Sequence, residues 1–176
     1  QEEMRRAVLR ISYEIVEANR GIKDLVLVGI RKRGAPLAER VQAHLKEIEG
    51  VEVPLGVLDI TLYRDDLQTI ANQPVVRTTE IPVDVNGKVV VLVDDVVSSG
   101  HTLATAAGIL KSQGASHVHC LITHPLFSNR SAERLTGANI EKIWSTDSIV
   151  HATNVIQLAP LLGDAVLGRL EEASLM

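Results

Sequence analysis

The chain has 176 residues and carries 22 acidic against 18 basic side chains, a formal net charge of −4. Its hydrophobic content of 45% excludes a disordered polyelectrolyte, and its acidic balance gives no global basic field of the kind that nucleic-acid-binding proteins carry. Aromatic residues make up only 2%, so we expect a core of Val, Leu, Ile and Ala, which suits buried parallel strands covered by helices. The length suits one domain spanning residues 1–176.

Cysteine content and hydropathy bear on the compartment. Cys120 is the single cysteine, which excludes a disulfide framework and favours a reducing, intracellular location. No apolar run approaches the roughly 20 residues that span a bilayer, and the N-terminal residues do not resemble a signal peptide. We therefore expect a cytoplasmic protein with no membrane partner.

The first third of the chain predicts a helix, a strand and a second helix. Apolar residues at helical spacing predict a first helix that Gly21 ends. Residues 25–30, LVLVGI, predict a fully apolar strand, and residues 31–34, RKRG, a turn leaving it. Residues 36–48 predict a second amphipathic helix that opens with a proline.

The middle of the chain predicts β structure with an excursion. Residues 51–63 are rich in residues that favour strands, and Asn86-Gly87 is a strong signal for a hairpin turn between strand pieces. The region from about 60 to 86 departs from the alternation of strand and helix. We expect a hood or hairpin excursion there rather than a second domain.

The second half of the chain resumes the alternation. An apolar strand that begins at residue 89 leads into an acidic turn, and the following helix ends at Gly114. The remaining expected elements are a strand at 117–124, a short helix at 129–137, a strand at 140–146 and a final helix at 160–174. This order is typical of an α/β fold with a parallel-sheet core flanked by helices.

The strongest functional signal lies in residues 89–103, VVVLVDDVVSSGHTL. In open α/β sheets, ligands bind beyond the carboxyl ends of the strands. Backbone N–H groups and hydroxyls at a helix N-terminus can hold a phosphate dianion, and no Walker A motif is present to hold one differently. The residues that could do so are Ser98, Ser99, Gly100, His101 and Thr102.

Two acids precede this turn. Asp94 and Asp95 would repel a phosphate, but they would accept hydrogen bonds from ribose hydroxyls or bind Mg²⁺. The combined pattern predicts a site for a phosphorylated sugar. In the alternative interpretation, Asp95 caps the following helix and Asp94 is a solvated strand end.

The stretch VVLVDDVVSSGHT resembles the phosphoribosyl pyrophosphate (PRPP) signature of type I phosphoribosyltransferases, which implies that fold. Residues from about 3 to 97, above all DITLYRDDL, resemble the PyrR family, which combines regulation of pyrimidine operon attenuation with uracil phosphoribosyltransferase activity. Residues from about 98 to 170 instead resemble the C-terminal domain of PRPP synthetases (ribose-phosphate pyrophosphokinases). The two resemblances meet near residues 95–98, and a natural mosaic, a reconstruction and an engineered chimera would look alike.

The resemblance implies roles for these residues. The 5′-phosphate of PRPP would lie against residues 98–102, and Asp94 and Asp95 would take the ribose hydroxyls as catalytic residues. Arg64, in the hood that residues 62–74 match, would approach the diphosphate as a further catalytic residue. Mg²⁺ would be the cofactor, held mainly through PRPP rather than by metal ligands of the chain.

A second loop matches the pyrophosphate loop of the family, in which a non-proline cis peptide is often found. Its backbone N–H groups would meet the leaving diphosphate. Its residues are Arg31, Lys32, Arg33 and Gly34. The alternatives are a solvated basic turn for this loop and an exposed connection for the hood.

Three functions remain open. The first is a Mg²⁺-dependent transfer of phosphoribosyl to uracil, giving UMP and pyrophosphate. The second is RNA-binding regulation, to which a basic face with Arg5, Arg6 and Arg10 could contribute. The third is a PRPP- or phosphate-binding scaffold with little turnover. Both families self-associate, which implies a homo-oligomer, either a dimer or a tetramer.

The nucleobase pocket is not carried over by the resemblance. His124 and residues 125–127 occupy the place where uracil lies in PyrR-like enzymes, and they match no PyrR residue. We expect His124 to be a strand-end histidine rather than a catalytic one.

Overall fold

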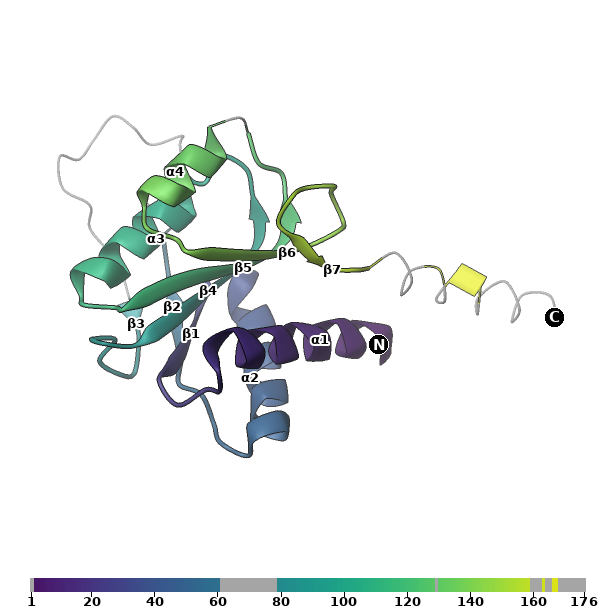
Figure 1. The fold of residues 1–176 in the computed structure, drawn as a ribbon, viewed down its shortest axis with the longest axis horizontal. Helices are drawn as coiled ribbons and strands as arrows, with labels where there is room; N and C mark the ends of the chain where they lie inside the picture. The colour runs from purple at the N-terminus through teal and green to yellow at the C-terminus, as the bar shows by residue number, and fades with distance from the viewer. Residues whose placement is uncertain (1, 61–78, 129, 159–162, 164–165, 168–176) are drawn as a thin grey trace.

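A computed structural model describes residues 2–60, 79–128, 130–158, 163, 166 and 167 (Figure 1). Within these residues, seven strands form one sheet in the order β3-β2-β1-β4-β5-β6-β7. Every neighbouring pair is parallel except β2 and β3, which are antiparallel. The strands are β1 (Leu25–Ile30), β2 (Leu55–Leu58), β3 (Thr79–Glu80), β4 (Val89–Val97), β5 (His117–Pro125), β6 (Lys142–Thr146) and β7 (Asn154–Ile156). The helices are α1 (Glu2–Asn19), α2 (Gly34–Glu49), α3 (His101–Ser112) and α4 (Ser131–Gly137).

Helices cover both faces of the sheet. Because successive strand residues point to opposite faces, β4 contributes to two apolar layers. Val90 and Leu92 pack with side chains of α3, whereas Val91 and Val93 pack with side chains of α1 and α2. Figure 1 shows α1 and α2 on one side of the sheet and α3 and α4 on the other. The expected α/β fold with a parallel-sheet core is therefore confirmed.

The hairpin prediction at Asn86-Gly87 is wrong. The turn itself exists, since Gly87 has a φ of 72° and the Lys88 N–H donates to the Val85 carbonyl at 3.0 Å. However, β3 pairs with β2, and both edges of β4 are taken by β1 and β5. The turn instead lies against the end of α3, where the Gly87 N–H donates to the Gly114 carbonyl at 2.9 Å.

Other differences concern the ends of elements. The acidic pair lies within β4 rather than in a turn after it. The strand expected within 51–63 is short, and β7 was not among the predicted strands. Most of the hood, including Arg64, and most of the expected final helix lie outside the described residues, so those predictions stay predictions. No helix in the described ranges has the length and apolar character needed to cross a membrane.

Strand β5 buries a histidine whose ring has an unpaired nitrogen. His119 is 5% exposed, and its Nδ1 has no hydrogen-bond partner within the described part of the chain. Its ring lies edge-on to Trp144, with centroids 5.4 Å apart, and stacks on His117 at 6.2 Å. Burial lowers the pKa of His119 below its ordinary 6.5, and the positive charges of Lys142, His117 and Lys111 act in the same direction against Glu141.

We expect His119 to make stability fall with acidification. As pH drops through 6.5, the unfolded chain takes up a proton that the folded protein refuses until its lower pKa is reached, so unfolding becomes more favourable. Urea unfolding at pH 7.5 and 5.5 measures the loss, which should be smaller in His119→Leu than in the wild type. At pH 7.5 the variant should lie within about 1 kcal/mol of the wild type, because leucine removes the unpaired nitrogen. His101→Gln, at an exposed position outside β5, should keep the wild-type loss, and an equal loss in His119→Leu would contradict this assignment.

Candidate functional site

The two acids lie at the carboxyl end of β4, between the ends of β1 and β5. Asp94 is 8% exposed, whereas the Asp95 side chain is 28% exposed. The Asp94 Oδ1 accepts the Asp95 N–H at 2.8 Å. The alternative in which Asp95 caps the following helix and Asp94 is a solvated strand end is wrong, because the N-cap of α3 is Gly100 and Asp94 is buried.

A basic loop leaves β1 beside these acids. The loop holds a cis peptide bond between Arg31 and Lys32, as the family resemblance implies. The Arg33 Nη1 lies 3.3 Å from the Asp95 Oδ2, and the Arg31 Nη1 lies 3.7 Å from the Asp59 Oδ2. The Arg33 side chain is 82% exposed, so its ion pair contributes little to stability. The arginines of the loop nevertheless pair with the carboxylates of Asp59 and Asp95, so the loop is not simply a solvated basic turn.

Two glycines allow the loop to pack this closely. A Cβ on Gly34 would overlap the Val93 carbonyl oxygen and lie 3.1 Å from the Asp94 Cα. A Cβ on Gly29 would lie 2.5 Å from the Ala35 Cα. The start of α2 therefore touches the backbone of β4 at the acidic pair, and only glycine fits there. Gly29 was not singled out from the sequence, although it opens the same stretch, GIRKRG.

The turn between β4 and α3 exposes a helix N-terminus. Gly100 has a φ of 76°, and its carbonyl accepts the first helical bond, from the Ala104 N–H at 2.9 Å. The backbone N–H of His101 donates to the Ser99 Oγ at 3.4 Å. An α-helix leaves its first N–H groups without intrahelical partners, so the N-terminus of α3, whose N-cap is a glycine, is suited to an anion.

Helix α4 supports this turn, a contact that sequence reasoning missed. The Ser131 Oγ donates to the Ser98 carbonyl at 2.5 Å, and the Arg134 guanidinium donates to the Ser99 carbonyl. Leu135, buried in the core, is the side chain nearest to Gly100. Nothing in the local pattern of residues 129–137 signals this role, because the partners lie more than 30 positions away in the chain.

Gly100→Ala is expected to weaken the turn. The residue has a left-handed φ, and an added Cβ would lie 3.2 Å from the Leu135 Cδ2. We expect a loss of about 1–2 kcal/mol in unfolding free energy, the usual cost of a left-handed conformation for alanine. Urea unfolding measures it. Gly137→Ala, where an added Cβ meets no atom within 4 Å, is the control; an equal response of both variants would argue against a special role for Gly100.

The end of β5 is already engaged in internal contacts. The His124 Nδ1 lies 2.9 Å from the Ser148 Oγ, and the rings of Phe127 and His151 meet edge-on with centroids 4.6 Å apart. His124 is the penultimate residue of β5, so it lies at the strand end as expected.

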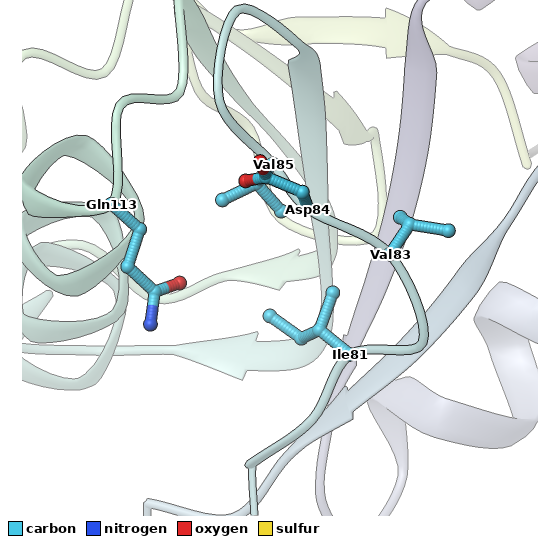
Figure 2. Close-up of a pocket in the computed structure, with 5 residues that line it drawn as sticks. All are labelled: Ile81, Val83, Asp84, Val85 and Gln113. Atoms are coloured by element: carbon cyan, nitrogen blue, oxygen red, sulfur yellow. The ribbon is translucent and has the colours of Figure 1, made fainter.

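A pocket of about 460 Å³ lies elsewhere. Figure 2 shows its lining, with Gln113 at the end of α3 facing the segment that leads into β4. The lining residues are Ile81, Val83, Asp84, Val85 and Gln113. Because this segment precedes β4, the pocket lies at the amino end of that strand, away from the acids.

The two carboxylates at the end of β4 suit a Mg²⁺ ion that is shared with a bound substrate, rather than one that is held by protein ligands alone. Within the described residues, no group of three or more His, Cys, Asp or Glu side chains could hold a metal. Asp94 and Asp95 offer adjacent carboxylates at the strand end. Mg²⁺ is usually bound through one or two carboxylates together with substrate phosphates and water, which is compatible with this arrangement.

Comparison with known proteins places the chain in a family. The model of the phosphoribosyl transferase domain matches residues 1–159. The chain belongs to the phosphoribosyltransferase domain family. It is 58% identical over 111 residues to the bifunctional protein PyrR of Pelotomaculum thermopropionicum, an alignment that covers 63% of this chain and 61% of that protein. The chain spans about three fifths of the length of the PyrR relatives it matches.

Solved phosphoribosyltransferases and synthetases share this fold. The phosphoribosylpyrophosphate synthetase of Mycobacterium smegmatis matches with a TM-score of 0.70 at 24% identity, over 94% of this chain and 51% of that one. The purine phosphoribosyltransferase of Pyrococcus horikoshii matches with a TM-score of 0.53 at 25% identity, over 73% of this chain and 77% of that one. The resemblance to both PyrR and PRPP synthetases is therefore confirmed, the latter as a likeness of fold.

Proposed function

We propose that this phosphoribosyltransferase-family protein binds PRPP and transfers its phosphoribosyl group to uracil, giving UMP and pyrophosphate, as a PyrR-like enzyme. One observation carries the proposal. The contact of Gly34 with the backbone of Val93 and Asp94 brings the basic loop beside the acidic pair. The N-terminus of α3 follows β4 after a turn of three residues. A sugar with a phosphate at one end and a diphosphate at the other needs such a combination of acids and anion-binding loops.

Each group of residues takes one part of PRPP in this proposal. The 5′-phosphate lies on the turn of residues 98–102, and Asp94 and Asp95 accept hydrogen bonds from the ribose hydroxyls. The loop of residues 31–34 receives the diphosphate, which Arg64 also approaches. Bound with PRPP beside Asp94 and Asp95, Mg²⁺ supplies positive charge that favours departure of the diphosphate.

The reaction forms a bond between the uracil nitrogen N1 and C1′ of the ribose while the bond from C1′ to the diphosphate oxygen breaks. The diphosphate leaves with the electron pair, and the N1 proton passes to solvent. The chain contributes by orienting PRPP and by stabilising the negative charge that develops on the diphosphate. No covalent intermediate with the protein is required.

A binding function with little turnover is the second candidate, and the end of β5 favours it. His124 is held by Ser148, and Phe127 packs on His151, so these residues already have partners in the place where PyrR-like enzymes hold the base. We further infer that the chain is a mosaic of a PyrR-like front and a synthetase-like back. We also propose that it is cytoplasmic and forms a homo-oligomer.

Two measurements on the full chain test the proposal. Isothermal titration with PRPP in the presence of Mg²⁺ reports binding, and conversion of uracil to UMP reports transfer. Binding with turnover supports the enzyme, binding without turnover supports the second candidate, and absence of binding removes both. RNA-binding regulation, for which Arg5, Arg6 and Arg10 lie exposed on α1, predicts binding to RNA that weakens steeply with added salt.

A further inference from the structure

Side chains of the short helix α4 donate hydrogen bonds to two carbonyl oxygens of the turn after β4. Ser131 donates to the Ser98 carbonyl, and that carbonyl also accepts the Ser128 N–H at 3.3 Å. Arg134 donates to the next carbonyl along the chain, that of Ser99. Two successive peptide units of the turn are therefore fixed by side chains of α4 and by the segment that leads into it.

The hydroxyl of Ser131 is fully engaged in this contact. Ser131 is completely buried, and its single hydrogen points to the Ser98 carbonyl. Its oxygen lies 2.9 Å from the Ser128 nitrogen, whose N–H it accepts, and 2.9 Å from the Ser128 Oγ. Because the hydrogen of Ser131 is already used, the Ser128 hydroxyl is the donor between the two serines. This network has one arrangement of hydrogens and fixes the position of Ser131.

The anchored carbonyls determine where the N–H groups of the turn point. In a trans peptide unit, the C=O of one residue and the N–H of the next point in opposite directions. The Ser98 carbonyl faces α4, so the Ser99 N–H faces away from it. The Ser99 carbonyl also faces α4, so the Gly100 N–H faces away as well. Both N–H groups therefore point away from α4.

Helix α4 is itself fixed to the core. Leu135 is 1% exposed and belongs to the same apolar layer as Leu103 and Leu110 of α3. Figure 1 shows α4 lying alongside α3 at one end of the sheet, and residues of the two helices are in contact. The burial of Leu135 therefore holds the neighbouring Arg134 and, one turn earlier, Ser131 at a constant distance from the turn.

We propose that Ser131 and Arg134 are positioning residues for phosphate binding: they hold the carbonyls of Ser98 and Ser99 so that the turn presents its N–H groups to a phosphate monoester. This inference rests on the proposed function, because it assigns the support of the same phosphate site. Neither residue touches the phosphate itself. Their effect is on affinity, through the orientation of the backbone.

Titration of the full chain with ribose 5-phosphate tests the proposal. Ser131→Ala and Arg134→Met should each raise the dissociation constant about tenfold, as expected when an orienting hydrogen bond is lost. Arg134→Lys should recover most of the affinity, because an ammonium group can donate to the same carbonyl. Arg130→Met is the matched control, since Arg130 is the exposed N-cap residue of α4 and its substitution removes the same charge as Arg134→Met. It should stay within about twofold of the wild type, because surface charges contribute little.

A ligand-free measurement separates positioning from charge and from folding. The amide resonances of Ser99 and Gly100 should shift in Ser131→Ala and Arg134→Met, but not in Arg130→Met. Ser131 carries no charge, so its effect isolates orientation. Should Ser131→Ala fail to fold, the Arg134 variants decide the matter, because that side chain is only half-buried.

The outcomes distinguish this proposal from the function it rests on. If the wild type binds ribose 5-phosphate and the variants at 131 and 134 bind it as well as Arg130→Met does, the positioning role is wrong and the phosphate site stands. If the wild type does not bind ribose 5-phosphate at all, the phosphate role of the turn is wrong and the positioning role is lost with it.

Discussion

Gly34→Ala is expected to lower the unfolding free energy by about 3 kcal/mol, the upper end of the usual cost of overpacking. The added methyl group would overlap the Val93 carbonyl oxygen and lie 3.0 Å from the carbonyl carbon. Rotation of a side chain cannot relieve this overlap, because the atoms it meets belong to the backbone. Either β4 or the start of α2 has to move. The loop of residues 31–34 and the acidic pair would then no longer be in register.

The same variant is expected to lose affinity for PRPP by about 10- to 100-fold, the range for losing a hydrogen bond to a charged group, because the displaced loop no longer meets the diphosphate. Urea unfolding and isothermal titration measure the two effects separately. Gly108→Ala is the control, because Gly108 is an exposed residue within α3 and an added Cβ meets no atom within 4 Å. That variant should gain about 0.5–1 kcal/mol from helix propensity. Wild-type stability and affinity in Gly34→Ala would show that the close contact has no function.

Local sequence patterns predicted an element correctly where all of its residues lie in the same environment, for example all buried. Residues 25–30 match β1 at both ends, because all six residues are buried between two layers and the sequence around them is polar. The Asn86-Gly87 signal describes a turn correctly but says nothing of what the flanking chain pairs with. That depended on β1 and β5 occupying both edges of β4, which no local pattern reveals.

The extension of β4 through Asp94 and Asp95 has a similar cause. Charge indicated the end of a strand, yet the pairing with β5 continues, with Asp94 opposite Ile122 and Val96 opposite His124. Backbone hydrogen bonds of a ladder do not depend on the side chain, so a central strand can carry acids at its end when they have partners or solvent. The sheet thereby holds both carboxylates on a fixed backbone.

In the candidate site, the components could be predicted from the sequence but their support could not. The acids, the basic loop and the small-residue turn are each contiguous in the chain and form recognisable patterns. The contacts that fix them join distant residues: Gly34 with the end of β4, and Ser131 and Arg134 with the turn. Serine and arginine on an ordinary short helix are common, so only the folded arrangement gives them meaning.

The two resemblances divide these contacts in a consistent way. Arg33 and Gly34, which meet the acids, precede the junction at residues 95–98, as does Asp94 itself. Ser131 and Arg134 follow it, and the turn that they support begins within it, at Ser98. The contacts of each part therefore lie on its own side of the junction or reach into it, and the continuous strand β4 joins the two parts. A mosaic of two related proteins can preserve a sugar-phosphate site under this condition.

Asp94→Asn and Asp95→Asn are each expected to weaken PRPP binding by about 10- to 100-fold, the range for losing a hydrogen bond to a charged group. Asparagine keeps the size of the side chain, and at position 94 its oxygen can still accept the Asp95 N–H. Stability should change little in Asp95→Asn, because the pair with the exposed Arg33 is worth about 0–1 kcal/mol. Asp84→Asn, at the amino end of β4, is the control, since its side-chain oxygen can still accept the Asn86 N–H.

A titration with inorganic phosphate, which has no ribose, tests whether the acids act on the ribose hydroxyls of PRPP. The acids repel an isolated anion, so the two variants should bind inorganic phosphate as tightly as the wild type or more tightly, while they bind PRPP more weakly. Opposite responses to the two ligands would separate the ribose hydroxyls from the phosphate within one site. If both ligands weaken together, the acids act through the shape of the turn. If PRPP binding is unchanged in both variants, the acids do not contact the ribose, and the turn of residues 98–102 alone holds the ligand.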